Sequence, residues 1–211
     1  MVIIDSPPAS RAGSLELVGG ELALDFANTS SGRGWPSHLE HLRSAENVVD
    51  WARHAKLLSA ADALWLGAKV GADAALARKM LSRALRLREG IHAIAVELAA
   101  GHPAPGVAVD GLAKAHASYL ARAKLASEAG RYVWSWEPRE APVEALLGPI
   151  ALSAMTTLTQ ADLARVKRCG NEKCGWVFFD ATKNKSRRWC EMEVCGNRAK
   201  QSRHIAKARG M

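Results

Sequence analysis

The spacing of four cysteines near the C-terminus constrains the fold of this chain more than any other feature. Cys169 and Cys174 form one close pair, Cys190 and Cys195 form a second, and fifteen residues separate the two pairs. Two close pairs joined by a hairpin-length segment can supply the four thiolates of a tetrahedral zinc site. Four thiolates fill the coordination sphere and leave no position for a catalytic water. The pattern therefore predicts one structural zinc ion.

The alternative is that the cysteines form disulfides, which suits a secreted chain. The N-terminal sequence MVIIDSPPASRAGS has neither the basic start nor the apolar run of a secretion signal. The longest mainly apolar stretch, residues 146–158, is shorter than the roughly 20 residues that span a bilayer. We therefore expect a cytoplasmic protein without a membrane span, in which the cysteines are reduced and bind zinc. Redox sensing, in which oxidation of the thiolates ejects the metal, is a further role for such a site.

The residues around the cysteines predict a small unit that zinc holds together. Trp176 to Asp180 has the composition of a strand, residues 181–186 form a polar turn, and residues 187–190 are expected to return as its hairpin partner. Asn197 is a candidate cap for a final helix over residues 198–209. The expected order is knuckle, β-hairpin, knuckle, helix, and structural zinc compensates for the small core.

Positive charge is concentrated in the same region. Residues 165–211 contain 13 Lys and Arg against 4 Asp and Glu, a net charge of +9, whereas residues 1–164 carry 16 against 17, a net charge of −1. A cationic helix face next to a cationic loop suits a phosphate backbone, where counterion release drives binding. Arg198 lies on the Ile205 side of the helix, so a structural role is equally expected for it. The candidate nucleic-acid contacts are Arg187, Arg188, Arg198, Lys200, Arg203 and Lys207.

The neutral part of the chain reads as a helical body. Apolar residues recur at helical spacing, and one segment, residues 131–137, alternates like a strand. The predicted helices cover residues 44–58, 59–70, 72–100 (with a break possible near Gly90), 110–129 and 142–166. Arg83, Arg86 and Arg88 are expected on a solvated helix face. The fold class is thus mainly α, and the predicted division is a flexible tail (1–14), a helical domain (15–162) and a four-cysteine zinc finger (163–211).

A polar pair lies in an otherwise apolar segment near the start of the body. Asp25 and Asn28 occur within ELALDFANT, residues 21–29, and must cap a backbone group, face solvent or line a cavity. The last alternative makes them candidate ligands for a small-molecule effector. No nucleophile and base are paired at a recognisable spacing anywhere in the chain, so we expect no enzymatic activity.

These segments resemble two known families. Residues 190–200, CEMEVCGNRAK, preceded by Trp189, resemble the CGNR-type zinc finger, and residues 169–189 resemble its first cysteine pair and aromatic strand. GGELALDFANT at residues 19–29 resembles the opening motif of the ABATE domain, and LTQADLARVKRC at residues 158–169 resembles its junction with the finger. The resemblance implies a bacterial, stress-induced transcription regulator with zinc on all four cysteines, a nucleic-acid-binding finger and a sensor or ligand-binding body.

Two functions follow from these observations. The first is a zinc-dependent DNA-binding transcriptional regulator whose body binds an effector. The second is a protein-interaction module in which zinc only stabilises a docking surface. A DNA-binding regulator often reads two half-sites, so a homodimer is expected with the first function.

Overall fold

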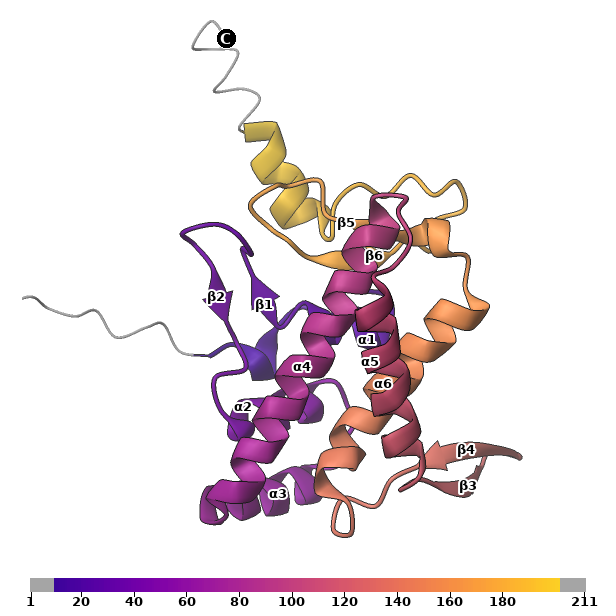
Figure 1. Cartoon of the computed structure of the whole chain (residues 1–211). Coiled ribbons are helices and arrows are strands. Elements are labelled where there is room, and N and C mark those ends of the chain that lie inside the picture. The colour runs from indigo at the N-terminus through magenta and orange to yellow at the C-terminus, as the bar shows by residue number, and fades with distance from the viewer. Residues whose placement is uncertain (1–9, 202–211) are drawn as a thin grey trace, which may run out of the picture.

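The computed structural model describes residues 10–201, and its fold is mainly α-helical with short antiparallel strand pairs (Figure 1). The helices are α1 (Leu22–Ala27), α2 (Ala45–His54), α3 (Ala60–Ala72), α4 (Ala74–Ala99), α5 (Gly106–Leu120) and α6 (Pro142–Gln160). The strand pairs are β1 (Ser30–Ser31) with β2 (Leu39–Glu40), β3 (Lys124–Glu128) with β4 (Arg131–Ser135), and β5 (Val166–Arg168) with β6 (Val177–Phe179). Within the described residues, no helix is long and apolar enough to cross a membrane.

Helix α4 runs through the centre of the body. Asp73 caps it by accepting hydrogen bonds from the amides of Ala75 and Leu76, both at 3.0 Å. Its apolar stripe is buried at Met80, Leu87, Ile91 and Ile94. The helix continues through Gly90 without a break, and Asp73 separates it from α3.

One member of the expected solvated arginine face is buried instead. Arg88 is 4% exposed and donates two hydrogen bonds to the carboxylate of Glu40, at 2.5 and 2.7 Å, and one to Glu89, at 2.8 Å. A buried guanidinium needs such partners because the loss of hydration is costly. Arg88 therefore ties α4 to β2 and is not part of a solvated surface.

The segment expected to extend a helix to residue 129 changes to a strand. Helix α5 ends at Leu120, and β3 pairs with β4 so that Leu125 lies opposite Trp134 and Ser127 opposite Tyr132. This hairpin projects at the end of the body away from the finger (Figure 1). Trp136, just after β4, is 8% exposed and donates to the carbonyl of Tyr119 at 2.8 Å, which anchors the hairpin to α5.

Part of the predicted flexible tail is packed. Residues 12–14 form a short 3-10 helix, η1, in which Ala12 is buried. The hydroxyl of Ser10 donates to the carbonyl of His41 at 2.7 Å. The prediction is therefore wrong for residues 10–14, because an apolar side chain and a hydrogen bond hold them to the body; residues 1–9 lie outside the described part.

The finger hairpin differs from the prediction in its partner strand. β6 pairs with β5, with Val166 opposite Phe179 and Arg168 opposite Val177, rather than with residues 187–190. Val166 and Val177 are buried in the same apolar core as the body helices. The strand that precedes Cys169 therefore joins the finger to the body through shared core residues.

Helical structure after the second cysteine pair starts earlier than expected. A π-helical turn, η3, spans Met192–Gly196 and leads into an α-helical segment over residues 197–201. Asn197 consequently lies within the helix and does not cap it, and its side-chain amide donates to the carbonyl of Glu193 at 2.8 Å. The rest of the expected helix, residues 202–209, lies outside the described residues.

Candidate metal centre and its junction with the body

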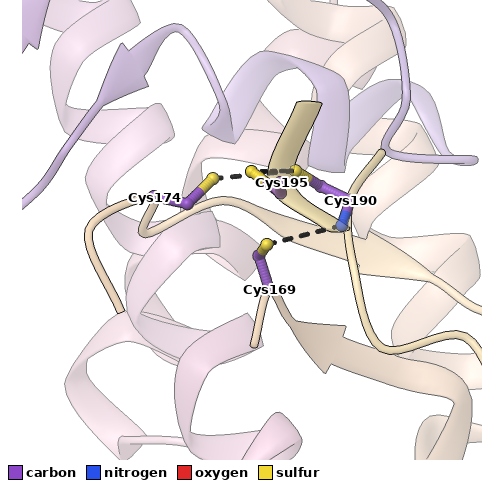
Figure 2. A group of neighbouring side chains, drawn as sticks. All are labelled: Cys169, Cys174, Cys190 and Cys195. Atoms are coloured by element: carbon purple, nitrogen blue, oxygen red, sulfur yellow. Dashed lines mark hydrogen bonds between the residues drawn. The ribbon is translucent and has the colours of Figure 1, made fainter. Parts of the chain in front are cut away.

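The four cysteine side chains converge on one point (Figure 2). Their sulfur atoms all lie within 4.8 Å of one another, with Sγ to Sγ distances of 3.6 Å from Cys174 to Cys190 and from Cys190 to Cys195. Zn–S bonds of about 2.3 Å at tetrahedral angles separate the sulfurs by about 3.8 Å. The cluster therefore has the composition and size of a site for a single zinc ion, and all four predicted ligands are brought together.

Hydrogen-bond donors surround the sulfurs and suit a thiolate site. The amide of Cys190 donates to Sγ of Cys169 at 3.5 Å, and the side-chain amide of Asn171 donates to Sγ of Cys195 at 3.7 Å. Such contacts partly neutralise thiolate charge and orient the ligands. Cys169, Cys190 and Cys195 are buried and Cys174 is half-buried. With four protein ligands and little solvent access, the site is structural in kind.

The first knuckle requires glycine at one position. Gly175 has φ of +75°, a conformation that other residues seldom adopt, and a Cβ there would lie 3.1 Å from Cβ of Arg33. Glycine therefore permits both the turn after Cys174 and the close approach of the body.

A buried carboxylate organises the loop between the two knuckles. Asp180 is fully buried and accepts hydrogen bonds from Nζ of Lys167 at 2.7 Å, from the hydroxyl and amide of Thr182 at 2.6 and 2.9 Å, and from the amide of Arg187 at 2.9 Å. Burial raises the pKa of Asp180, but these hydrogen bonds outweigh it and hold the pKa well below its usual range. Asp180 therefore stays ionised and closes the loop. The Asp-x-Thr sequence was the available signal for this turn.

Arg187 is used within the fold. Its guanidinium donates to the carbonyls of Val18 at 2.8 Å, Trp189 at 3.1 Å and Cys190, and it stacks 4.3 Å from the ring centroid of Phe178. These contacts fix the second knuckle to the segment before α1. The prediction that Arg187 contacts phosphate is therefore replaced by a structural role.

Three of the other predicted nucleic-acid contacts lie on the outside of the finger. Arg188 is exposed beside Trp189, and Arg198 and Lys200 are exposed on the helical segment that projects from the finger (Figure 1). Arg203 and Lys207 lie outside the described residues. The structure thus leaves Arg188, Arg198 and Lys200 facing solvent.

Asp25 and Asn28 join the finger to the body. The side chain of Asn28 donates to the carbonyl of Val177 and accepts from its amide, both at 2.9 Å, and Asn28 is buried. Asp25 accepts from the amide of Gly19 at 2.7 Å, and the carbonyl of Gly19 in turn accepts from the amide of Phe179 at 2.7 Å. Burial raises the pKa of Asp25 to about 6, although the Gly19 amide and the charge of Arg187 lower it. The expected effector site at these residues is therefore wrong, since both serve backbone groups at the junction.

Helix α4 and the β1–β2 loop complete the junction. Nε2 of His92 donates to the carbonyl of Gly175 at 2.9 Å, and burial lowers the pKa of His92, which keeps it neutral. Arg33 pairs with Glu89 of α4 at 2.6 Å, and Nε1 of Trp35 donates to the carbonyl of Glu172 at 3.0 Å. Sequence reasoning missed these contacts because each joins residues more than 50 positions apart.

The geometry defines a class of protein: a helical domain fused through a shared core to a four-cysteine zinc finger. Family models agree with this architecture. Residues 165–208 match the CGNR zinc finger, and residues 20–161 match the ABATE family, described as "Putative stress-induced transcription regulator". The ABATE match covers most of the chain, so the protein belongs to the ABATE family. No curated protein matches the chain.

Proposed function

We propose that this protein is a zinc-dependent transcriptional regulator that binds DNA through the finger and senses a small molecule through the helical body. The observation that carries the proposal is the exposure of Arg188, Arg198 and Lys200 on the outside of a finger whose zinc site is closed. Four protein ligands leave no open coordination position, so the zinc is structural. Exposed Arg and Lys side chains can contact the phosphates of a nucleic-acid backbone. The family description as a transcription regulator supports the same function.

The proposal predicts steep salt dependence. If Arg188, Arg198, Lys200, Arg203 and Lys207 each neutralise one phosphate, the slope of log K against log salt is about −4.5. The experiment titrates zinc-loaded protein into fluorescent random-sequence duplex DNA at salt concentrations between about 50 and about 200 mM. Lys200→Ala should reduce the magnitude of the slope by about 1. Lys79→Ala, an exposed lysine on α4, is the matched control and should leave the slope unchanged.

A zinc-loaded, folded protein that does not bind DNA at low salt would overturn the proposal. The remaining function would be a protein-interaction module, for which Met192 and Val194, 50% and 39% exposed beside the finger, offer an apolar contact. Cys190→Ser tests whether DNA binding depends on zinc, because it removes a zinc ligand and leaves every Lys and Arg of the finger in place.

We further propose that the regulator acts in the cytoplasm as a homodimer, since two-fold symmetry allows two fingers to read two half-sites. Sedimentation equilibrium of zinc-loaded protein measures this directly. A monomer at micromolar concentrations, with or without DNA, would contradict it.

A further inference from the structure

A groove lies between α4 and α5 on the helical body. Its volume is about 580 Å³, within the range of small-molecule sites. The walls are mainly apolar and include the buried side chains of Leu87, Leu112 and Tyr119. The groove does not include Asp25 or Asn28 and is separate from the zinc site.

Two glycines leave the groove open. Gly90 of α4 and Gly111 of α5 both line it, and a Cβ placed on either would meet no atom within 4 Å. Glycine within a helix costs roughly 0.5–1 kcal/mol relative to alanine. Close packing does not explain why glycine occurs at these two positions, because a larger side chain would fit. The space beside each glycine is part of the groove.

Cations and a hydroxyl donor lie along the apolar walls. Arg86 and Lys114 are exposed at the rim, and Arg83 pairs with Glu144 at 3.0 Å, so the rim carries a net positive charge. Burial raises the pKa of Tyr119, whose hydroxyl therefore stays protonated. In the described part of the chain this hydroxyl has no hydrogen-bond partner and is free to donate to an anion.

The groove also shares a helix with the finger junction. Gly90 lies between Glu89, which pairs with Arg33, and His92, which donates to the carbonyl of Gly175 in the first knuckle. An occupant that moves this turn of α4 therefore acts on residues that hold the finger.

We propose that this groove binds an amphipathic organic anion, with its apolar body against Leu87 and Leu112 and its carboxylate or sulfonate near Arg86, Lys114 and Tyr119. The inference rests on the proposed function only for its regulatory meaning, because occupancy of the groove is measurable without DNA.

The first test uses two fluorescent probes that share an aromatic body. 1-Anilinonaphthalene-8-sulfonate carries a sulfonate, and N-phenyl-1-naphthylamine does not. We expect the full zinc-loaded protein to bind the sulfonate at one site, more tightly than the uncharged amine. Arg86→Gln and Lys114→Gln should each weaken sulfonate binding by about threefold and leave amine binding unchanged. Equal affinities for the two probes, unaffected by these substitutions, would overturn the assignment of an anion.

Filling the groove is the second test. Gly90→Leu and Gly111→Leu should each weaken sulfonate binding by at least about tenfold, because the Cβ at each position meets no atom within 4 Å and the rest of the side chain extends into the groove. Both should keep the fold, since leucine favours helix. Gly71→Leu, at an open position on α3 outside the groove, is the matched control. Probe binding that survives both groove variants would show that the probe binds elsewhere and would contradict the proposal.

Coupling to the finger is read separately. If the protein binds DNA, saturating sulfonate probe should change its affinity for duplex DNA in wild type but not in Gly90→Leu. A groove that binds the probe while DNA affinity stays constant refutes the regulatory role alone. A protein that binds the probe but no DNA refutes the proposed function and leaves the anion site intact.

Discussion

At the scale of single residues, Asn28 does what a neighbouring strand would otherwise do. Its amide satisfies both backbone groups of Val177 at the edge of β6. From the sequence, Asn28 could be recognised as a polar residue that needed a partner, but that partner lies 149 positions away. The zinc ligands were predictable because their spacing is local and their chemistry specific. The structural role of Arg187 could not be predicted, because the sequence shows that the residue is charged but not which carbonyl groups lie near it.

Replacing Asn28 should weaken the body and the finger together. Asn28→Ala leaves the buried amide and carbonyl of Val177 unpaired, which should lower the free energy of unfolding by about 3 kcal/mol. Asn28→Asp keeps an acceptor but places carboxylate oxygens against the carbonyl, so it should also destabilise. Urea unfolding of zinc-loaded protein measures both. Asn184→Ala, on the exposed loop, is the control, and a loss no larger than its own would contradict the role of Asn28.

Asp25 should make stability depend on pH. Its carboxyl has a pKa of about 6 in the folded protein, above its ordinary value, so the folded state binds this proton more tightly than the unfolded chain. Its contribution to stability is therefore greatest at low pH and is lost as the pH rises through about 6. Asp25→Asn keeps an acceptor for the Gly19 amide and removes the charge.

The variant should gain stability over wild type as the pH rises from about 4 to about 6, reaching about 3 kcal/mol, of which about 1 kcal/mol is gained above about pH 5. Urea unfolding of both proteins at matched zinc and pH gives this difference, in which other titrations cancel. A difference that stays constant with pH would count against an ionisable Asp25 at the junction.

At the scale of elements, local periodicity predicted the helices better than the strands. The stripe of α4 is visible in the sequence, and Asp73 has the chemistry of a cap. Residues 124–128, KLASE, are mostly good helix formers, and pairing with β4 turns them into a strand. β6 likewise had a strand composition, but its partner β5 could not be chosen from composition, because pairing depends on contacts across the body.

Helix α6 contains a glycine that packing requires. A Cβ on Gly148 would lie 2.5 Å from the indole of Trp136, the residue that anchors the β3–β4 hairpin. Gly148→Ala should therefore lower the free energy of unfolding by about 2 kcal/mol, although alanine normally stabilises a helix. Gly67→Ala, where a Cβ meets open space, should instead raise it by about 0.5 kcal/mol. Thermal unfolding compares them, and equal effects would refute the proposed clash.

At the scale of the whole molecule, zinc should stabilise the body as well as the finger. Val166 and Val177 belong to the body core, and Asn28 and His92 hold β6 and the first knuckle. Structural zinc is worth on the order of 10 kcal/mol in small fingers. Chelation should therefore lower the melting temperature of the whole chain.

Two probes follow this transition. Far-UV circular dichroism reports the body helices, and near-UV signals include Trp176 and Trp189 of the finger. Both should shift to lower temperature on chelation. Helices that melt at an unchanged temperature after zinc is removed would show that the body is stable by itself.

The two-sided hydrogen bond of Asn28 also bears on how such a chain can evolve. A finger whose strand edge is completed by a side chain of the preceding domain cannot be moved by gene fusion behind an unrelated domain without exposing that edge. A finger placed behind another domain would need a different group to pair these two backbone atoms. Because these bonds go to backbone atoms, any residue except proline can replace Val177 and keep them, so the constraint falls on Asn28, 149 positions away.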